Sequence, residues 1–213
     1  MQLTKLGHAC VRLEKDGARL VIDPGGWSGP GVLAGASAVL VTHEHADHLD
    51  AAEVRAALTA SPGLELWTNA SVAAQFEDFG GRVHAVGHGD TFAAAGFDVH
   101  VYGSEHARIM PGIPLVANTG FAVDGAVFHP GDSFTVPEDH VPVLLLPVSA
   151  PWLKFAETAA YAAQVAPSRG GYAIHDAILS AEGLALTGNL LKMLTQPGAA
   201  AFTRLEPGAT VEI

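Results

Sequence analysis

Thr42-His43-Glu44-His45-Ala46-Asp47-His48 is the stretch that decides how this sequence is interpreted. Three imidazoles and a carboxylate fall between His43 and His48, directly after a short apolar run at residues 38–41. Such a run is typical of a buried strand, and a tight loop after it can aim alternate side chains at one point. Imidazole nitrogen and carboxylate oxygen are the ligands that zinc, iron and manganese accept in catalytic sites. We therefore predict a metal site here. The alternative is a polar loop that is rich in histidine for no functional reason, but four potential ligands at this spacing are improbable by chance.

The composition indicates a compact fold. The chain has 213 residues, with 49% hydrophobic and 15% charged, which suits one domain with a large core. We therefore expect residues 1–213 to form a single domain. We also expect no membrane association and a cytoplasmic location, because no apolar run could span a bilayer and the N-terminus lacks the layout of a signal peptide. The single cysteine, Cys10, lies in an apolar stretch and is interpreted as a small buried residue.

The charge balance argues against a nucleic-acid partner. The formal net charge is −11, and only 11 lysines and arginines are scattered along the chain. Nucleic-acid binding usually depends on such cations neutralising phosphates. We expect a small-molecule substrate instead. The 11 histidines form an excess that metal binding would explain.

Hydrophobic runs and turn residues predict an α/β fold. Asp16-Gly17 and Asp124-Gly125 are predicted to form hairpin turns, and Asp50 is predicted to cap a helix. Strands are expected at residues 3–6, 10–14, 19–22, 38–41, 64–68, 83–86, 97–102, 117–123, 126–129, 143–146, 172–175, 202–205 and 210–213, and helices at 51–60, 70–79, 155–165 and 182–194. Two sheets packed face to face with helices outside would bury these strands, although periodicity alone does not select that layout over other α/β arrangements.

The pattern HxHxDH resembles the signature of the metallo-β-lactamase fold, and the rest of the chain is consistent with it. Gly7-His8-Ala9, a hairpin and then Ile22-Asp23-Pro24 resemble the opening strands of that family. Gly131-Asp132-Ser133 is similar to its Gly-Asp-Ser/Thr element, and His106 and Ile174-His175-Asp176 follow strands where further histidines belong. The resemblance implies a four-layer αββα sandwich of two mixed β-sheets flanked by helices. The most similar subgroup is that of small hydrolases like L-ascorbate-6-phosphate lactonase.

The same resemblance implies two divalent metal ions, expected to be zinc, with manganese or iron also compatible. His43, His45 and His106 would hold one ion, Asp47, His48 and His175 the other, and Asp132 would bridge them. Two departures from the family concern substrate contacts more than metal binding. The residues around His106 are unusual, and Asp176 follows His175 where relatives often carry an aromatic residue.

A site with two such ions indicates a hydrolase whose nucleophile is a hydroxide that bridges the metals. A divalent metal lowers the pKa of bound water from about 15.7 towards 7, which makes hydroxide available at neutral pH. Asp47 and Asp132 are the predicted catalytic residues, which would orient the hydroxide and receive its proton. Glu44 and Asp176 either accept hydrogen bonds from ligand imidazoles or are simply solvated, and the sequence does not decide between these roles.

Charge counting favours a small anionic ester, lactone or phosphodiester as substrate. Two divalent cations outweigh two aspartates and one hydroxide, so the centre stays slightly positive. His8, Arg108 and Lys154 are the candidate substrate-binding residues, because His8 ends a strand near the site and the two cations lie on candidate loops. Trp27 and Trp152 are expected to anchor loops by packing.

Other functions stay open. The protein could be a catalytically silent metal- or ligand-binding protein on the same fold, or a nuclease, although the acidic charge disfavours the latter. A true β-lactamase is disfavoured because the commonest zinc β-lactamases use a cysteine ligand that follows the histidine motif, whereas Cys10 precedes it. Homo-oligomerisation is a further possibility that the sequence does not test. The remaining histidines, which are expected to be structural or on the surface, are His84, His88, His100, His129 and His140.

Overall fold

Two seven-stranded sheets form the centre of the molecule. The computed structural model describes residues 1–194 and 201–213. The first sheet contains β1 (Gln2–Gly7), β2 (Cys10–Lys15), β3 (Ala18–Ile22), β4 (Ala38–Val41), β5 (Glu65–Thr68), β6 (Val83–Ala85) and β14 (Thr210–Glu212), in the order β14-β1-β2-β3-β4-β5-β6. The second contains β7 (Thr91–Ala94), β8 (Phe97–Tyr102), β9 (Gly120–Val123), β10 (Val127–His129), β11 (Val143–Pro147), β12 (Gly170–Ile174) and β13 (Phe202–Thr203), in the order β13-β12-β11-β10-β9-β8-β7.

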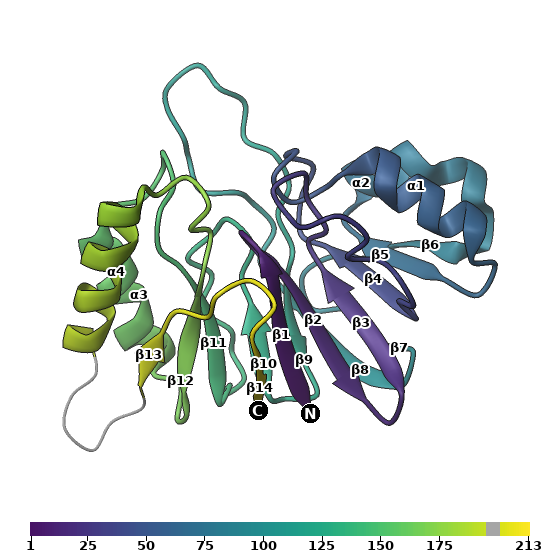
Figure 1. Ribbon diagram of the computed structural model, residues 1–213. Helices are drawn as coiled ribbons and strands as arrows, with labels where there is room; N and C mark the ends of the chain where they lie inside the picture. Colours follow the sequence, from purple (N-terminus) through teal and green to yellow (C-terminus); the bar gives the residue numbers. More distant parts are fainter. Residues whose placement is uncertain (195–200) are drawn as a thin grey trace.

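Helices cover the outer faces of both sheets (Figure 1). On the first sheet lie α1 (Ala51–Ala60), α2 (Ala70–Ala73) and the 3₁₀ segment η1 (Ala74–Arg82), and on the second lie α3 (Phe155–Val165) and α4 (Ala181–Leu194). Both sheets mix parallel and antiparallel pairs, as β3–β4 and β10–β9 illustrate. The predicted four-layer αββα sandwich of two mixed β-sheets is therefore confirmed.

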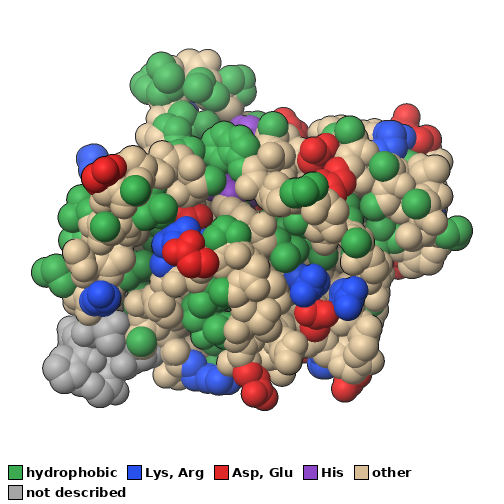
Figure 2. All heavy atoms as spheres, in the orientation of Figure 1, with side chains coloured by type: hydrophobic (Ala, Val, Ile, Leu, Met, Phe, Trp, Pro, Cys, Tyr) green, Lys and Arg blue, Asp and Glu red, His purple; other side chains and the backbone are tan. Residues whose placement is uncertain are grey.

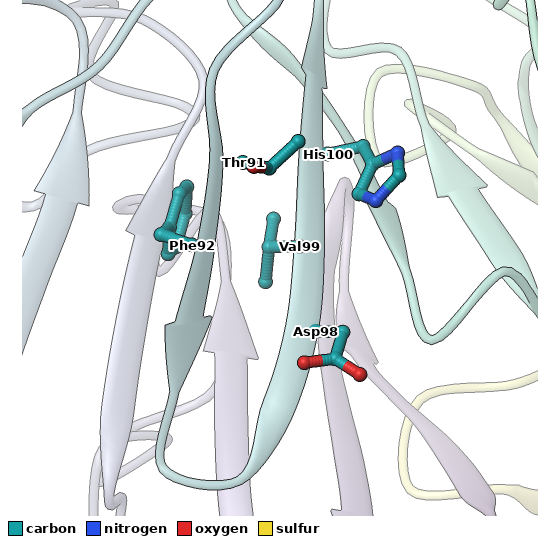
Figure 3. Close-up of a pocket in the computed structure, with 5 residues that line it drawn as sticks. All are labelled: Thr91, Phe92, Asp98, Val99 and His100. Carbon is teal, nitrogen blue, oxygen red and sulfur yellow. The ribbon is translucent and has the colours of Figure 1, made fainter.

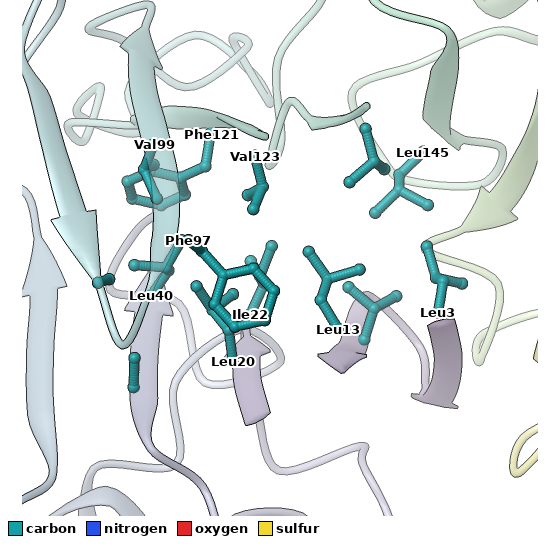
Figure 4. Close-up of a cluster of buried hydrophobic side chains, with 14 of the residues drawn as sticks. Leu3, Leu13, Leu20, Ile22, Leu40, Phe97, Val99, Phe121, Val123 and Leu145 are labelled. Atoms are coloured by element: carbon teal, nitrogen blue, oxygen red, sulfur yellow. The ribbon is translucent and has the colours of Figure 1, made fainter. Parts of the chain in front are cut away.

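Three apolar clusters hold these layers together. The central cluster lies between the sheets, where Leu13 and Ile22 of the first sheet face Val99 and Phe121 of the second (Figure 4). A second cluster joins the first sheet to α1 and its neighbours, and a third joins the second sheet to α3 and α4. Strands in the middle of each sheet are covered on both faces and are apolar throughout, as β4 and β11 show by having every residue buried. Strands β7 and β8, which end the second sheet, instead expose some of their residues.

Several local predictions are confirmed. Helix α1 begins after Asp50, whose carboxylate accepts hydrogen bonds from the backbone N–H groups of Ala52 and Glu53. Asp16-Gly17 and Asp124-Gly125 both adopt the positive φ angles that the predicted hairpin turns require.

Other local predictions are wrong. The helix expected at residues 70–79 ends at Ala73 and continues as η1, which contains non-helical backbone at Phe76 and Gly80. Phe76 is fully buried, so packing against the sheet outweighs the local helical preference. The strand expected at 117–123 begins only at Gly120, and the edge strand β7 was not anticipated.

The directions of the strands place the loops that carry the predicted site residues at one end of the sandwich. Strands β3, β4 and β5 run parallel to one another, and so do β10, β11 and β12. Strand β1 is antiparallel to β2, which is antiparallel to β3, so β1 and β3 share one direction. The same reasoning through β9 gives β8 the direction of β10. The carboxyl ends of β1, β3 and β4 and of β8, β10 and β12 are therefore at one end of their own sheets. Among the described residues, no helix is long and apolar enough to cross a membrane.

Candidate metal centre

Histidine and aspartate side chains from both sheets converge at this end of the sandwich. His43, His45 and His106 bring ligand atoms within 4.8 Å of one another, and His43 Nε2 is 3.1 Å from His45 Nδ1. The first two residues follow β4 and the third follows β8, so this group spans the two sheets.

A second group adjoins the first. Asp47, His48 and His175, together with His8, also bring ligand atoms within 4.8 Å of one another. His175 Nε2 lies 3.5 Å from Asp47 Oδ2. The structure thus brings His175, which follows β12, against the loop that follows β4.

Asp132 lies between the two groups. Its Oδ2 is 3.3 Å from His106 Nε2 and 3.0 Å from His175 Nε2, while its Oδ1 is 3.0 Å from His48 Nε2. His43, His48 and Asp132 form a third cluster by the same distance criterion. One carboxylate therefore contacts histidines of both groups, which is the position that the family resemblance implies for a bridging residue.

Hydrogen bonds on the far side of each ring orient the histidines. Nδ1 of His48 donates to Asp23 Oδ2 at 2.6 Å, and Nδ1 of His175 donates to the carbonyl of Ser149 at 2.6 Å. Nδ1 of His106 donates to the carbonyl of Ala107. These bonds keep a proton on Nδ1 and direct Nε2 into the cluster, so that each ring can bind a metal through Nε2 once that nitrogen is deprotonated.

Asp23 is a functional residue whose role the sequence analysis missed. Its Oδ1 accepts the backbone N–H of Thr42 at 2.7 Å, and its Oδ2 accepts the Thr42 hydroxyl at 2.8 Å. Because that hydroxyl donates to Asp23, its oxygen is free to accept from His43 Nδ1 at 2.9 Å. Asp23 therefore fixes His48 directly and His43 through Thr42. The signal was Ile22-Asp23-Pro24 at the end of a strand parallel to β4, since neighbouring parallel strands end side by side.

Four polar atoms in the centre are buried without a hydrogen-bond partner: His48 Nε2, His106 Nε2, Asp132 Oδ1 and His175 Nε2. Buried polar atoms are normally paired, and an unpaired group carries its full desolvation penalty. Four such atoms pointing at one another form a cradle for cations. The donor set of imidazole and carboxylate fits zinc, manganese or iron.

The charges in the cluster depend on one another. Burial would lower the pKa of His175, but the approach of its Nε2 to the carboxylates of Asp132 and Asp47 outweighs burial and raises that pKa to about 9. Burial likewise opposes ionisation of Asp132, yet His48 and the neighbouring imidazoles hold the pKa of that carboxyl well below its usual range. Protons on imidazoles thus balance the buried carboxylates, a role that bound cations can take over.

His8 belongs to the second group by distance but differs in its protonation. Its Nδ1 accepts the backbone N–H of Ala177 at 3.2 Å, so the neutral ring carries its proton on Nε2. Nε2 lies 3.3 Å from Asp47 Oδ2, to which it donates. Burial lowers the pKa of His8, which favours this neutral form. His8 is therefore a hydrogen-bond donor to Asp47, and its side chain is fully buried.

The backbone is strained where it presents these residues. His8, Asp23 and His175 have φ angles of 35°, 53° and 60°, a region that residues other than glycine rarely adopt. Gly131 has a φ of 62°, and a Cβ there would lie 2.3 Å from Asn118 Oδ1. Asn118 Oδ1 accepts the N–H of Asp132, so the glycine allows the close approach that holds the Asp132 loop.

Asp176 does not accept a hydrogen bond from a ligand imidazole. Its Oδ1 lies 2.8 Å from Lys5 Nζ and its Oδ2 lies 2.6 Å from Arg204 Nε. Lys5 is buried, and its Nζ also donates to the carbonyl of Ala173. This ion-pair network fixes the backbone directly after His175. Glu44, the other residue considered for that role, is exposed.

The residues predicted to contact substrate or to anchor loops differ in their exposure and in their contacts with the cluster. Arg108 and Lys154 are exposed, and the described residues provide neither side chain with an ion pair. Trp152, expected only to pack, also donates from Nε1 to Asp132 Oδ2 at 2.9 Å. Trp27 is 50% exposed and its ring lies 4.8 Å from that of His8. The two tryptophans therefore border the cluster.

The remaining histidines have structural or surface partners. His129 is buried, donates to the Ala9 carbonyl and accepts the N–H of Gly131. His84 contacts Glu65, His100 contacts Asp139, His140 contacts Ser168, and His88 accepts the N–H of Gly103. A surface hollow of about 270 Å³ lies at His100 on β7 and β8 (Figure 3). Its lining residues belong to none of the potential metal-binding groups in the described part of the chain.

Comparison with known proteins agrees with this geometry. Residues 2–169 match the family model described as "Beta-lactamase superfamily domain". The Mycobacterium tuberculosis protein Rv0786c is 37% identical over 202 residues, covering 92% of this chain and 93% of that protein. A UPF0173 metal-dependent hydrolase of a Chelativorans species is 30% identical over 154 residues, covering 62% of this chain and 63% of that protein.

A solved structure shares the fold. Igni18, described as a metallo hydrolase from Ignicoccus hospitalis, superposes with a TM-score of 0.74 at 22% identity, covering 99% of this chain and 97% of that chain. The αββα sandwich with a histidine–aspartate cluster defines a class of metal-dependent hydrolases. The chain belongs to the metallo-β-lactamase superfamily.

Proposed function

We propose that the protein is a hydrolase that uses two divalent metal ions, most simply zinc. His43, His45 and His106 would hold one ion, and Asp47, His48 and His175 the other. Asp132 would contact both. His8 is excluded from this ligand set because its Nδ1 already accepts a backbone N–H and its Nε2 carries the proton.

The four unpartnered buried atoms carry this proposal. His48 Nε2 and His175 Nε2 each lie 3.0 Å from an oxygen of Asp132, yet neither nitrogen makes a hydrogen bond. A cation bound among these atoms would offset the cost of about 1–3 kcal/mol for each unsatisfied group. The outer hydrogen bonds of His43, His48, His106 and His175 support the same conclusion, because on each ring they use Nδ1 and leave Nε2 facing the other ligands of the cluster.

Such ions would supply a hydroxide nucleophile at neutral pH and polarise the bond to be cleaved. The residues of this chain would supply the rest of the reaction. Asp132 and Asp47 are close enough to the centre to orient the attacking water and to receive a proton. Trp152 holds one oxygen of Asp132 by a hydrogen bond, and His8 holds one oxygen of Asp47. These two donors would keep the carboxylates aligned during turnover.

The substrate we propose is a small anionic ester, a phosphorylated lactone or a phosphodiester. The positive character of a centre with only two carboxylate ligands supports this choice. Arg108 and Lys154 support it as well, since both are exposed cations without ion-pair partners among the described residues. The resemblance of the sequence to hydrolases like L-ascorbate-6-phosphate lactonase supports the same choice.

The test combines metal content with turnover. Purified protein loaded with zinc, manganese or iron should bind two equivalents and hydrolyse bis(p-nitrophenyl) phosphate or an anionic lactone. Asp132→Asn should lose most activity, whereas Asp139→Asn, at an exposed position, should keep it. Two bound metals without hydrolysis of any compound would favour a binding protein. Faster cleavage of neutral esters than of all anionic compounds would refute the proposed substrate class.

A further inference from the structure

An apolar arm projects from the sandwich beside the metal centre. Between β8 and β9, the chain leaves the second sheet and protrudes beyond it (Figure 1). We call residues 107–116 the flap. Both of its ends are fastened to the centre, because His106 N donates to the Val116 carbonyl at 3.0 Å and Ala107 N donates to the Asp132 carbonyl at 2.8 Å.

The tip of the flap is a defined turn. Ile113 N donates to the Met110 carbonyl at 3.3 Å, and Gly112 between them has a φ of 91°. Pro111 followed by a glycine at positive φ is the arrangement of a type II turn. The two residues that flank this turn, Met110 and Ile113, are both apolar.

The flap exposes apolar surface next to imidazoles. Met110 is 54% exposed, Ile113 40% and Leu115 39%. Figure 2 shows this hydrophobic surface on the protruding segment, with histidine atoms reaching the surface near its foot. Exposed apolar surface is costly in water, so its concentration on one protruding segment indicates a binding role.

Apolar side chains also border the opposite part of the centre. Trp27 packs its ring 4.8 Å from that of His8. Ile178, which is 48% exposed, follows His175 by three residues, and the bond from Ala177 N to His8 holds its segment in place. Of the eight large hydrophobic residues exposed in the described chain, five lie on the flap or at these two positions. That concentration differs from the single, scattered exposure of ordinary surfaces.

We infer that the substrate carries an apolar alkyl, acyl or aryl group next to the bond that is cleaved. This group would pack between the flap and the surface of Trp27 and Ile178. The inference rests on the proposed hydrolase function and narrows its substrate to an amphiphilic anion. The occupant is assigned to the substrate because both ends of the flap are hydrogen-bonded to residues of the metal centre, so that the apolar surface of the flap begins next to the residues that would hold the metals.

The direct test measures binding apart from turnover. Zinc-loaded protein is titrated with methyl-, butyl- and hexylphosphonate by isothermal calorimetry. Affinity should increase about three- to fourfold for each added methylene until the apolar surface is filled. Equal affinity for all three phosphonates would overturn the inference, even if the protein is an active hydrolase.

Turnover and matched variants complete the test. With p-nitrophenyl alkyl phosphates, the ratio of kcat/KM for the hexyl and methyl compounds should be large in the wild type. It should fall at least tenfold in Met110→Ser/Ile113→Ser. Leu186→Ser/Met193→Ser makes the same kind of change on exposed positions of α4 and should keep the wild-type ratio.

Two outcomes separate the possible failures. Absence of any turnover with two bound metals would refute the hydrolase function, while graded phosphonate binding would still support an apolar subsite. If sedimentation shows that the flap variant converts a dimer into a monomer and the hexyl-to-methyl ratio is unchanged, the flap is an interface between copies of this chain and the inference is wrong.

Discussion

Replacing Asp23 with asparagine should damage the metal centre without removing a single metal ligand. The Asp23 carboxylate is fully buried and accepts three hydrogen bonds, at 2.7 Å from Thr42 N, 2.8 Å from Thr42 Oγ1 and 2.6 Å from His48 Nδ1. Asparagine has nearly the same shape, but only one of its two terminal atoms accepts a hydrogen bond. If the amide oxygen keeps the backbone bond, its NH₂ group faces the Thr42 hydroxyl and the His48 N–H.

Two consequences can be worked out from these contacts. Losing two bonds to a charged acceptor, at about 1.5–3 kcal/mol each, should lower the free energy of unfolding of the metal-free protein by about 3–6 kcal/mol. His48 and, through Thr42, His43 would also lose the partners that fix their tautomers. Loss of such outer-shell partners typically lowers metal affinity about 10- to 100-fold.

Urea unfolding of the metal-free protein and calorimetric titration with zinc would measure both effects. Asp16→Asn is a matched control, because Asp16 has a φ of 52°, close to the 53° of Asp23, but is exposed in a hairpin turn. The control should change neither quantity. An Asp23→Asn variant with the stability and zinc affinity of the wild type would refute the reasoning that this carboxylate orients the histidines.

Three further variants or reagents probe other parts of the structure. Asp47→Ala should abolish hydrolysis of bis(p-nitrophenyl) phosphate and reduce bound metal. Its circular dichroism spectrum should be unchanged because Asp47 lies on a loop outside the three apolar clusters. Unchanged turnover would remove the two-metal mechanism. Lys5→Met should lower the free energy of unfolding in urea by about 3–5 kcal/mol because it leaves Asp176 buried without this partner. The double variant Lys5→Met/Asp176→Leu should recover much of that loss, and strictly additive losses would contradict a coupled pair. Burial raises the pKa of Cys10, so its thiol should resist iodoacetamide at pH 8 in the native protein and react after unfolding. Mass spectrometry would measure the labelling, and rapid labelling of the native protein would mean that the thiol is accessible.

The first half of the metal centre could be predicted from sequence because its residues are close together in the chain. His43, His45, Asp47 and His48 follow one apolar strand, and that strand and its loop need no distant partner to be identified. The helix capped by Asp50 is equally local, since the cap accepts bonds from residues two and three positions later. Positions for His106, Asp132 and His175 came from resemblance to a family, because nothing in their local spacing brings them to this loop.

The structure corrected or supplied what depends on long-range packing. Residues 70–79 have a helical pattern, but burial of Phe76 against the first sheet breaks the helix. Asp23 became recognisable as an orienting residue only when β3 and β4 were seen to pair in parallel. The network that joins Lys5 to Asp176 spans 171 positions of the chain (176 − 5) and requires β1 and β12 to be brought to the same end of the molecule.

The amino-acid sequence by itself therefore determined the strand-and-helix pattern and the chemical nature of the donors, because periodicity and spacing are properties of neighbouring residues. Only the tertiary structure decided which nitrogen of each imidazole is free, which carboxylate contacts both groups and which apolar loops border them. Those features arise where two sheets pack face to face, and the contacts across that junction are set by strand order and direction, which a local pattern does not encode.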